Sequence, residues 1–145
     1  MSKRTGAELD EELRIALRDA GLKVTAPRLA VLREMVRTTG PVSHAELTRR
    51  LDSKGLDRVT VWRNLVSLSE AGLLARTDVG DHTWRFEKTD PDEHGAHTHP
   101  HFICVACKKV SCLSEDAIYV KPSARRGSVV LDVQVKGRCE SCVTG

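Results

Sequence analysis

Residues 97–107 read H-T-H-P-H-F-I-C-V-A-C, so three alternating histidines stand just before a Cys-x-x-Cys motif. A second Cys-x-x-Cys motif, at 139–142, lies near the C-terminus. Each motif brings two sulfurs onto one tight turn, and two such turns supply the four thiolates of a tetrahedral zinc site. The sequence therefore predicts a structural zinc ion that ties the C-terminal end to the middle of the chain. Its four ligands are Cys104, Cys107, Cys139 and Cys142.

Length and composition set the broad class of the protein. The 145 residues make one domain or two small ones, and neither half can bury a large core, so a metal or a dimer partner is useful. The chain has no long apolar run and no apolar signal region, so we expect a cytoplasmic protein without a membrane span. In a reducing compartment the paired motifs favour a metal over disulfides; four thiols without metal are the alternative.

The first 78 residues hold the whole basic excess of a chain with net charge +3, and their apolar residues recur at helical spacing. Capping residues and breakers predict helices over 7–20, from Thr25 to the T-T-G-P at 38–41, from Ser43 to Gly55, and over 58–71. Two short strands joined at Gly80-Asp81 follow the last helix. This order is typical of a winged helix, in which the helix before the hairpin enters the major groove of DNA.

The fourth predicted helix carries the candidate DNA contacts. Val61, Leu65 and Leu68 share its apolar stripe; Arg63 lies opposite that stripe, and Thr60 and Trp62 lie on its flanks. The polar side chains either contact DNA or form a solvated face, because a fold alone does not give function. Beyond the polar stretch at 89–98 we predict strands at 101–104, 109–113 and 128–136, and the segment 117–122 also has the composition of a strand.

Four motifs now occur in a recognisable order. They are G-L-K-V-T-A-P-R at 21–28, T-V-W-R-N-L at 60–65 with E-A-G-L-L at 70–74, H-P-H-F-I-C-V-A-C at 99–107, and C-E-S-C at 139–142. With these motifs the chain resembles, over nearly its whole length, the ferric uptake regulator superfamily of bacterial metal-dependent repressors.

The resemblance implies an α+β fold. An N-terminal winged helix-turn-helix DNA-binding domain is expected at 1–88, a linker at 89–98, and a small C-terminal α/β metal-binding dimerisation domain at 99–145. It further implies a homodimer that binds double-stranded DNA at a palindromic operator. The DNA contacts that it implies are Lys23, Thr60, Trp62 and Arg63.

The resemblance also implies a second, regulatory metal site. Glu87, His99 and His101 match three of the family's ligands, and His97 extends the histidine alternation from the linker. Pro41 replaces the family's early histidine. Cys112 replaces its last carboxylate, and is either a ligand or a small buried strand residue. A thiolate with two imidazoles favours zinc over iron or manganese as the second divalent metal.

We therefore predict a metal-responsive, DNA-binding transcriptional repressor that controls metal homeostasis genes and depends on zinc rather than iron. Two alternatives lie within the same family: a peroxide or thiol redox sensor, and a regulator with structural zinc only and a degraded regulatory site. A zinc-dependent hydrolase and a zinc-ribbon interaction module are the alternatives from other classes. We expect no enzyme, because the sequence has no nucleophile motif, phosphate loop or acid–base pair outside the metal cluster.

Overall fold

The structure is a computed structural model that describes residues 4–89, 99–121, 126–130 and 132–144. Two compact units divide the chain. The helical unit lies within residues 1–38 and 42–89, and the cysteine unit lies within residues 39–41 and 90–145. Helices and small sheets together confirm the predicted α+β class. Among the described residues, no helix is both long and apolar enough to cross a membrane.

The helices of the helical unit begin at capping side chains. The Thr25 hydroxyl accepts the Arg28 backbone N–H and starts the second helix, as predicted. Ser43 and Glu46 form the predicted capping box at the third. The fourth helix begins at Asp57, whose carboxylate accepts the backbone N–H of Thr60 at 2.7 Å. The helices are α1 (Gly6–Asp19), α2 (Ala26–Arg37), α3 (His44–Leu51) and α4 (Arg58–Glu70).

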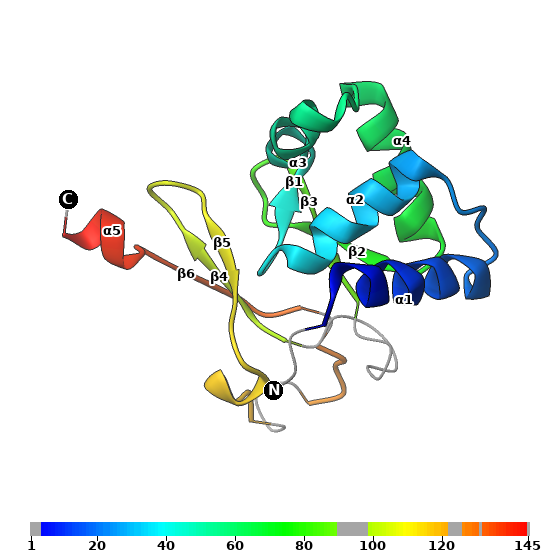
Figure 1. Ribbon diagram of the computed structural model, residues 1–145. Coiled ribbons are helices and arrows are strands. Elements are labelled where there is room, and N and C mark those ends of the chain that lie inside the picture. The colour runs from blue at the N-terminus through cyan, green and yellow to red at the C-terminus, as the bar shows by residue number, and fades with distance from the viewer. Residues whose placement is uncertain (1–3, 90–98, 122–125, 131, 145) are drawn as a thin grey trace. The chain divides into compact units, whose positions relative to one another are not determined.

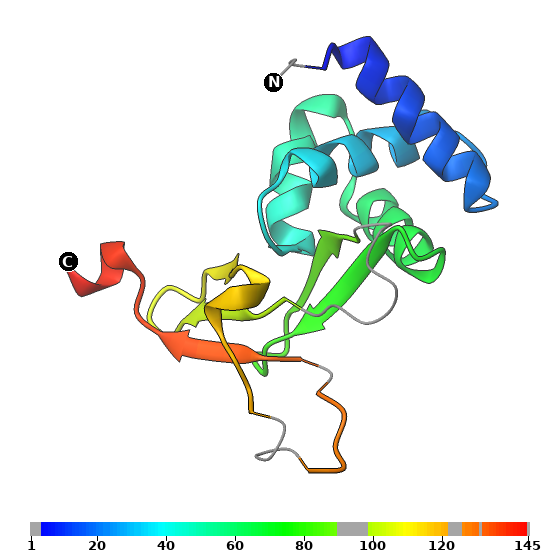
Figure 2. The same cartoon turned by 90° about the horizontal axis from the view of Figure 1, so that it is seen from below.

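The apolar faces of these helices meet in one core. The face of α4 predicted to point inward does so, since Val61, Leu65 and Leu68 have no exposed surface. A small antiparallel sheet joins this core through Val42 and Phe86. Its strands are β1 (Val42–Ser43), which the sequence analysis did not anticipate, β2 (Leu74–Asp78) and β3 (Trp84–Lys88), in the order β1-β3-β2. Figures 1 and 2 show α2, α3 and α4 next to the β2–β3 hairpin, with α1 packed on α2, as in a winged helix.

The cysteine unit is built on a second small sheet. Its strands are β4 (His101–Cys104), β5 (Val110–Cys112) and β6 (Gln134–Gly137), in the order β5-β4-β6. β4 pairs antiparallel with β5 and parallel with β6. The short helix α5 (Glu140–Val143) follows β6 and contains Cys142, while Cys139 immediately precedes it.

Two strand predictions in this unit need correction. The strand expected over 128–136 begins only at Gln134, and the described residues before it are irregular. The strand-like segment 117–122 starts with the last residue of a 3-10 turn, η2 (Glu115–Ala117), and its described remainder, 118–121, is irregular. Apolar, β-branched composition favours a strand only where a neighbouring strand offers hydrogen bonds. The described part of this chain offers none there, and Tyr119 is 76% exposed.

Candidate functional site

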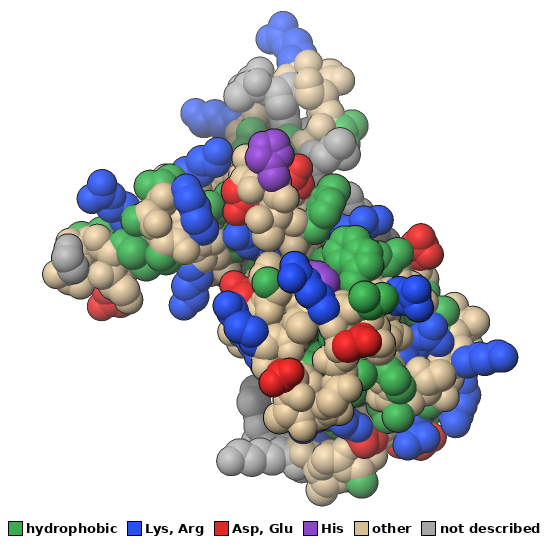
Figure 3. Space-filling view, turned by 90° about the horizontal axis from the view of Figure 1, so that it is seen from above, with side chains coloured by type: hydrophobic (Ala, Val, Ile, Leu, Met, Phe, Trp, Pro, Cys, Tyr) green, Lys and Arg blue, Asp and Glu red, His purple; other side chains and the backbone are tan. Residues whose placement is uncertain are grey.

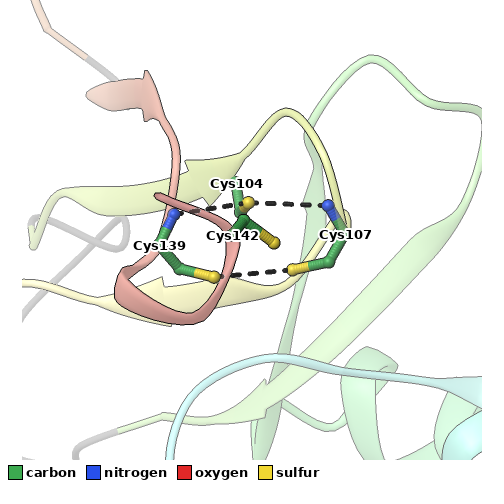
Figure 4. A group of neighbouring side chains, drawn as sticks. All are labelled: Cys104, Cys107, Cys139 and Cys142. Atoms are coloured by element: carbon green, nitrogen blue, oxygen red, sulfur yellow. Dashed lines mark hydrogen bonds between the residues drawn. The ribbon is translucent and has the colours of Figure 1, made fainter. Parts of the chain in front are cut away.

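The four predicted zinc ligands converge in the cysteine unit. Cys104 ends β4 and Cys107 completes the turn after it, while Cys139 precedes α5 and Cys142 lies within it. All four sulfurs lie within 4.8 Å of one another and point inward (Figure 4). The Cys107 and Cys139 sulfurs are 3.8 Å apart. A regular tetrahedron with Zn–S bonds of about 2.3 Å has edges of about 3.8 Å, so the cluster has the size of a zinc site.

The backbone around this cluster is arranged for negative charge. The N–H groups of Cys107 and Cys139 donate to the Cys104 sulfur at 3.5 and 3.4 Å, and they lower the pKa of Cys104 to about 6. Hydrogen bonds with the side chains of Cys139, Cys104 and Cys107 raise the pKa of Cys142 to about 12. Four crowded thiols therefore cannot all ionise on their own. A bound divalent cation removes that conflict, because a coordinating thiol is deprotonated outright.

A second group of side chains that could hold a metal ion lies on and beside the same sheet. His101 on β4 stands directly opposite Cys112 on β5, and His99 comes two residues before His101. The ligand atoms of His99, His101 and Cys112 all lie within 4.8 Å of one another. His101 is fully buried, His99 is half-buried and Cys112 is exposed, so Cys112 is not a buried strand residue. Two imidazoles and a thiol are a donor set that suits zinc.

A carboxylate outside the predicted ligand set stands behind His101. The Asp132 Oδ1 atom lies 3.6 Å from His101 Nδ1, and the Gln134 side chain donates to Asp132 Oδ2 at 2.7 Å. The backbone N–H of His101 donates to the Val133 carbonyl at 2.9 Å, which fixes the two segments side by side. The sequence held no signal for Asp132, because only the parallel pairing of β4 with β6 brings it to the histidine.

The other candidate regulatory ligands belong to other segments of the chain. Glu87 is on β3 of the helical unit, where its side chain is 5% exposed. His97 falls outside the described residues. Pro41, at the place of the family's early histidine, is buried. The metal-ligand roles of Glu87 and His97 stay predictions.

The candidate DNA contacts lie on or near α4. Arg63 and Lys23 are exposed, and Thr60 is half-buried. Trp62 is half-buried because its ring packs against two others, with centroid distances of 5.3 Å to His44 and 6.0 Å to Phe86. The surface seen in Figure 3 carries Lys and Arg side chains at many points, with Asp and Glu side chains between them. Positive charge on the surface in view is spread rather than gathered into one patch.

The loop before α2 is tied to α4. The Arg28 guanidinium donates to the Lys23 carbonyl at 2.7 Å and to the Ser67 hydroxyl of α4 at 3.3 Å. These bonds hold the loop that carries Lys23 against the helix that carries Arg63. In the sequence Arg28 is only the end of a motif, and its contacts with both the loop and α4 appear only in the folded chain.

The chain combines a winged-helix unit with a thiol cluster and a histidine–thiol cluster, and both clusters have the size of a metal site. This combination defines a metal-dependent DNA-binding protein. Comparisons with known proteins agree. The model of the ferric uptake regulator family matches residues 19–135. The ferric uptake regulation protein of Escherichia coli strain K12 is 37% identical over 106 residues, which cover 71% of this chain and 68% of that protein.

Solved structures show the same likeness. The crystal structure of the Vibrio cholerae ferric uptake regulator has a TM-score of 0.67 at 27% identity and covers 88% of this chain and 99% of that one. A zinc uptake regulator complexed with zinc and DNA has a TM-score of 0.63 at 25% identity and covers 98% and 97%.

The chain belongs to the ferric uptake regulator family. It is therefore a metal-responsive, DNA-binding transcriptional repressor and not an enzyme, which excludes the hydrolase and the interaction module.

Proposed function

We propose that this regulator responds to zinc, through a site whose ligands include His99, His101 and Cys112. The observation that carries the proposal is the thiol of Cys112 directly opposite the buried imidazole of His101. Iron and manganese sites in proteins are rich in carboxylates, whereas a thiolate beside imidazoles is typical of zinc. A zinc uptake regulator complexed with zinc and DNA is among the solved structures that resemble this chain.

The two clusters have different tasks in this proposal. Cys104, Cys107, Cys139 and Cys142 fill every position around a structural zinc ion, which contributes folding energy and no chemistry. His99, His101 and Cys112 bind the regulatory zinc, and Glu87 of the helical unit supplies the fourth ligand that the family resemblance predicts. A ligand set drawn from both units favours one of their arrangements over the others, and this links metal binding to DNA binding.

The proposed target is a palindromic operator bound by a homodimer. In a two-fold symmetric dimer, two copies of α4 enter major grooves about one helical turn apart, and the spacing of the half-sites mirrors the symmetry. Arg63 faces the bases, and Lys23 reaches a phosphate or the minor groove. When the regulatory zinc is absent, the spacing between the two copies of α4 is no longer fixed, and operator binding weakens.

This function is tested on an operator selected from random DNA in the presence of zinc. We expect removal of the regulatory zinc by mild chelation to weaken operator binding by about 10- to 100-fold, the usual size of an allosteric coupling. Cys112→Ser is expected to bind the operator equally weakly with and without zinc. Fluorescence anisotropy measures the affinity, and elemental analysis counts metals per chain.

Each outcome distinguishes the proposed function from one of its alternatives. Two zinc ions per chain, one of them removable, support a working regulatory site. A single zinc ion that resists chelation, with the same operator affinity before and after, would show a regulator with structural zinc only. Stronger operator binding with iron or manganese than with zinc contradicts the metal assignment, and unchanged zinc dependence in Cys112→Ser contradicts the ligand assignment.

Asp132 offers a separate prediction about the same site. Histidine ligands commonly donate their second ring N–H to a carboxylate, which fixes the tautomer and the ring orientation, and loss of that partner costs about 10- to 100-fold in metal affinity. We expect Asp132→Asn to weaken binding of the removable zinc by about tenfold, measured in competition with a chelator. Asp116→Asn, an exposed carboxylate in η2, is the matched control and should change nothing. Equal zinc affinity in Asp132→Asn and wild type would exclude the orienting role.

A further inference from the structure

One exposed apolar side chain stands at the start of α4. Val59 is 54% exposed, although Val61, two residues further on, is completely buried in the core. Its neighbours on the open surface of the helix are Arg58 and Arg63. The Asp57 carboxylate next to it is already engaged, since it accepts the backbone N–H of Thr60. The first turns of α4 thus present two arginines and one isopropyl group.

Trp62, the aromatic residue of the same helix, packs against neighbouring rings. Trp62 lies against His44 and Phe86, and the His44 Nε2 atom is 2.8 Å from the carbonyl oxygen of Arg58. These contacts join the start of α4 to α3 and turn the indole toward the interior. A contact between the indole ring of Trp62 and a thymine methyl is therefore less accessible.

The geometry of a helix places Val59 beside the proposed base reader. Residues four apart lie on the same helical face, so Val59 and Arg63 are neighbours along it. Side chains near the N-terminal end of a recognition helix reach base edges in the major groove, where the C5-methyl of thymine is the one apolar feature. We propose that Val59 is the apolar reader of α4 and contacts a thymine methyl next to the base bound by Arg63. This inference rests on the proposed entry of α4 into the major groove.

The test replaces thymine by uracil, which lacks only the C5-methyl. Each thymine of one half-site of the selected operator is exchanged in turn, and affinity is measured by anisotropy for wild type and Val59→Ala. We expect one or two positions at which uracil weakens wild-type binding by about three- to tenfold. Val59→Ala should bind the thymine operator more weakly by a similar factor and should not distinguish thymine from uracil there, as a double-mutant cycle requires of a direct contact.

A matched variant and checks of folding test whether the effect is specific to Val59. Ile15→Ala removes an apolar side chain of similar exposure, 48% on α1, and should retain the full preference for thymine. Val59→Ala keeps α4 folded, because alanine favours the helix more than valine does. Circular dichroism and the size of the particle in solution check both proteins.

The outcomes distinguish a failure of this inference from a failure of the proposed function on which it rests. An unchanged preference for thymine in Val59→Ala overturns the inference, and loss of that preference in Trp62→Ala instead assigns the methyl contact to Trp62. If Arg63→Ala also binds the operator like wild type, α4 is not the reader and the proposed DNA interface fails. If Arg63→Ala weakens binding while Val59→Ala keeps the preference for thymine, only the role of Val59 is wrong.

Discussion

Replacement of Cys104 by serine is expected to remove the tightly held zinc ion and to unfold the cysteine unit. Its sheet consists of the short strands β4, β5 and β6, and its sulfur cluster joins the end of β4 to α5. Structural zinc contributes about 10–16 kcal/mol of apparent binding free energy in zinc-finger peptides, far more than such a sheet can supply. Because the proposed regulatory ligands belong to the same unit, elemental analysis should find neither zinc ion, and hydrogen exchange should show loss of protection in β4.

The helical unit should survive the same change. It has a core of its own, in which the helix residues Leu17, Val31, Leu47, Val61, Leu65 and Leu68 have no exposed surface. The helical signal in circular dichroism should therefore remain. Cys112→Ser is the matched control, because it makes the same chemical change outside the four-sulfur cluster and should leave the tight zinc and the protection of β4 intact. Full zinc content and unchanged protection in Cys104→Ser would contradict the structural role of the cluster.

Local signals in the sequence were enough for much of the fold. Thr25 and the Ser43–Glu46 capping box start helices where their hydrogen-bonding side chains predict, because a cap acts within three residues of its own position. The buried stripe of α4 follows from its spacing alone. The four-cysteine cluster was predictable for a related reason, since each Cys-x-x-Cys motif forms its own half of the site before the halves meet.

Features that depend on pairing between distant segments were not predictable. Nothing local tells that β6 lies parallel to β4, and this pairing is what brings Asp132 to His101. The strand expected at 117–122 fails for a similar reason, because a strand needs a partner that composition does not reveal. Helical spacing placed Trp62 on the flank of α4, but only the packing of α3 and β3 shows that its ring lies against His44 and Phe86.

Charge reversal at Arg63 is expected to abolish specific operator binding without disturbing the fold. Arg63 is exposed on α4, its neighbours Val61 and Leu65 fill the core, and the helix starts from its own cap at Asp57. A bidentate contact from arginine to guanine contributes about 1–3 kcal/mol of discrimination, and a glutamate at the same place also repels the phosphates. We expect Arg63→Glu to lose at least about a hundredfold in affinity for the zinc-dependent operator. The zinc content and the particle size in solution should stay unchanged.

The matched control is Arg18→Glu, the same charge reversal at an exposed arginine of α1, whose side chain is 59% exposed. Both variants change the net charge of the chain by the same amount, so the long-range electrostatic attraction to DNA falls by a similar amount in both. Their binding to random DNA should therefore decline together, while only Arg63→Glu loses the preference for the operator. Equal loss of operator binding in the two variants would mean that charge alone holds this regulator on DNA. Full operator binding by Arg63→Glu would mean that a face other than that of α4 reads the sequence. A difference in operator affinity between two variants of equal net charge cannot come from net charge alone, so it assigns base recognition to α4.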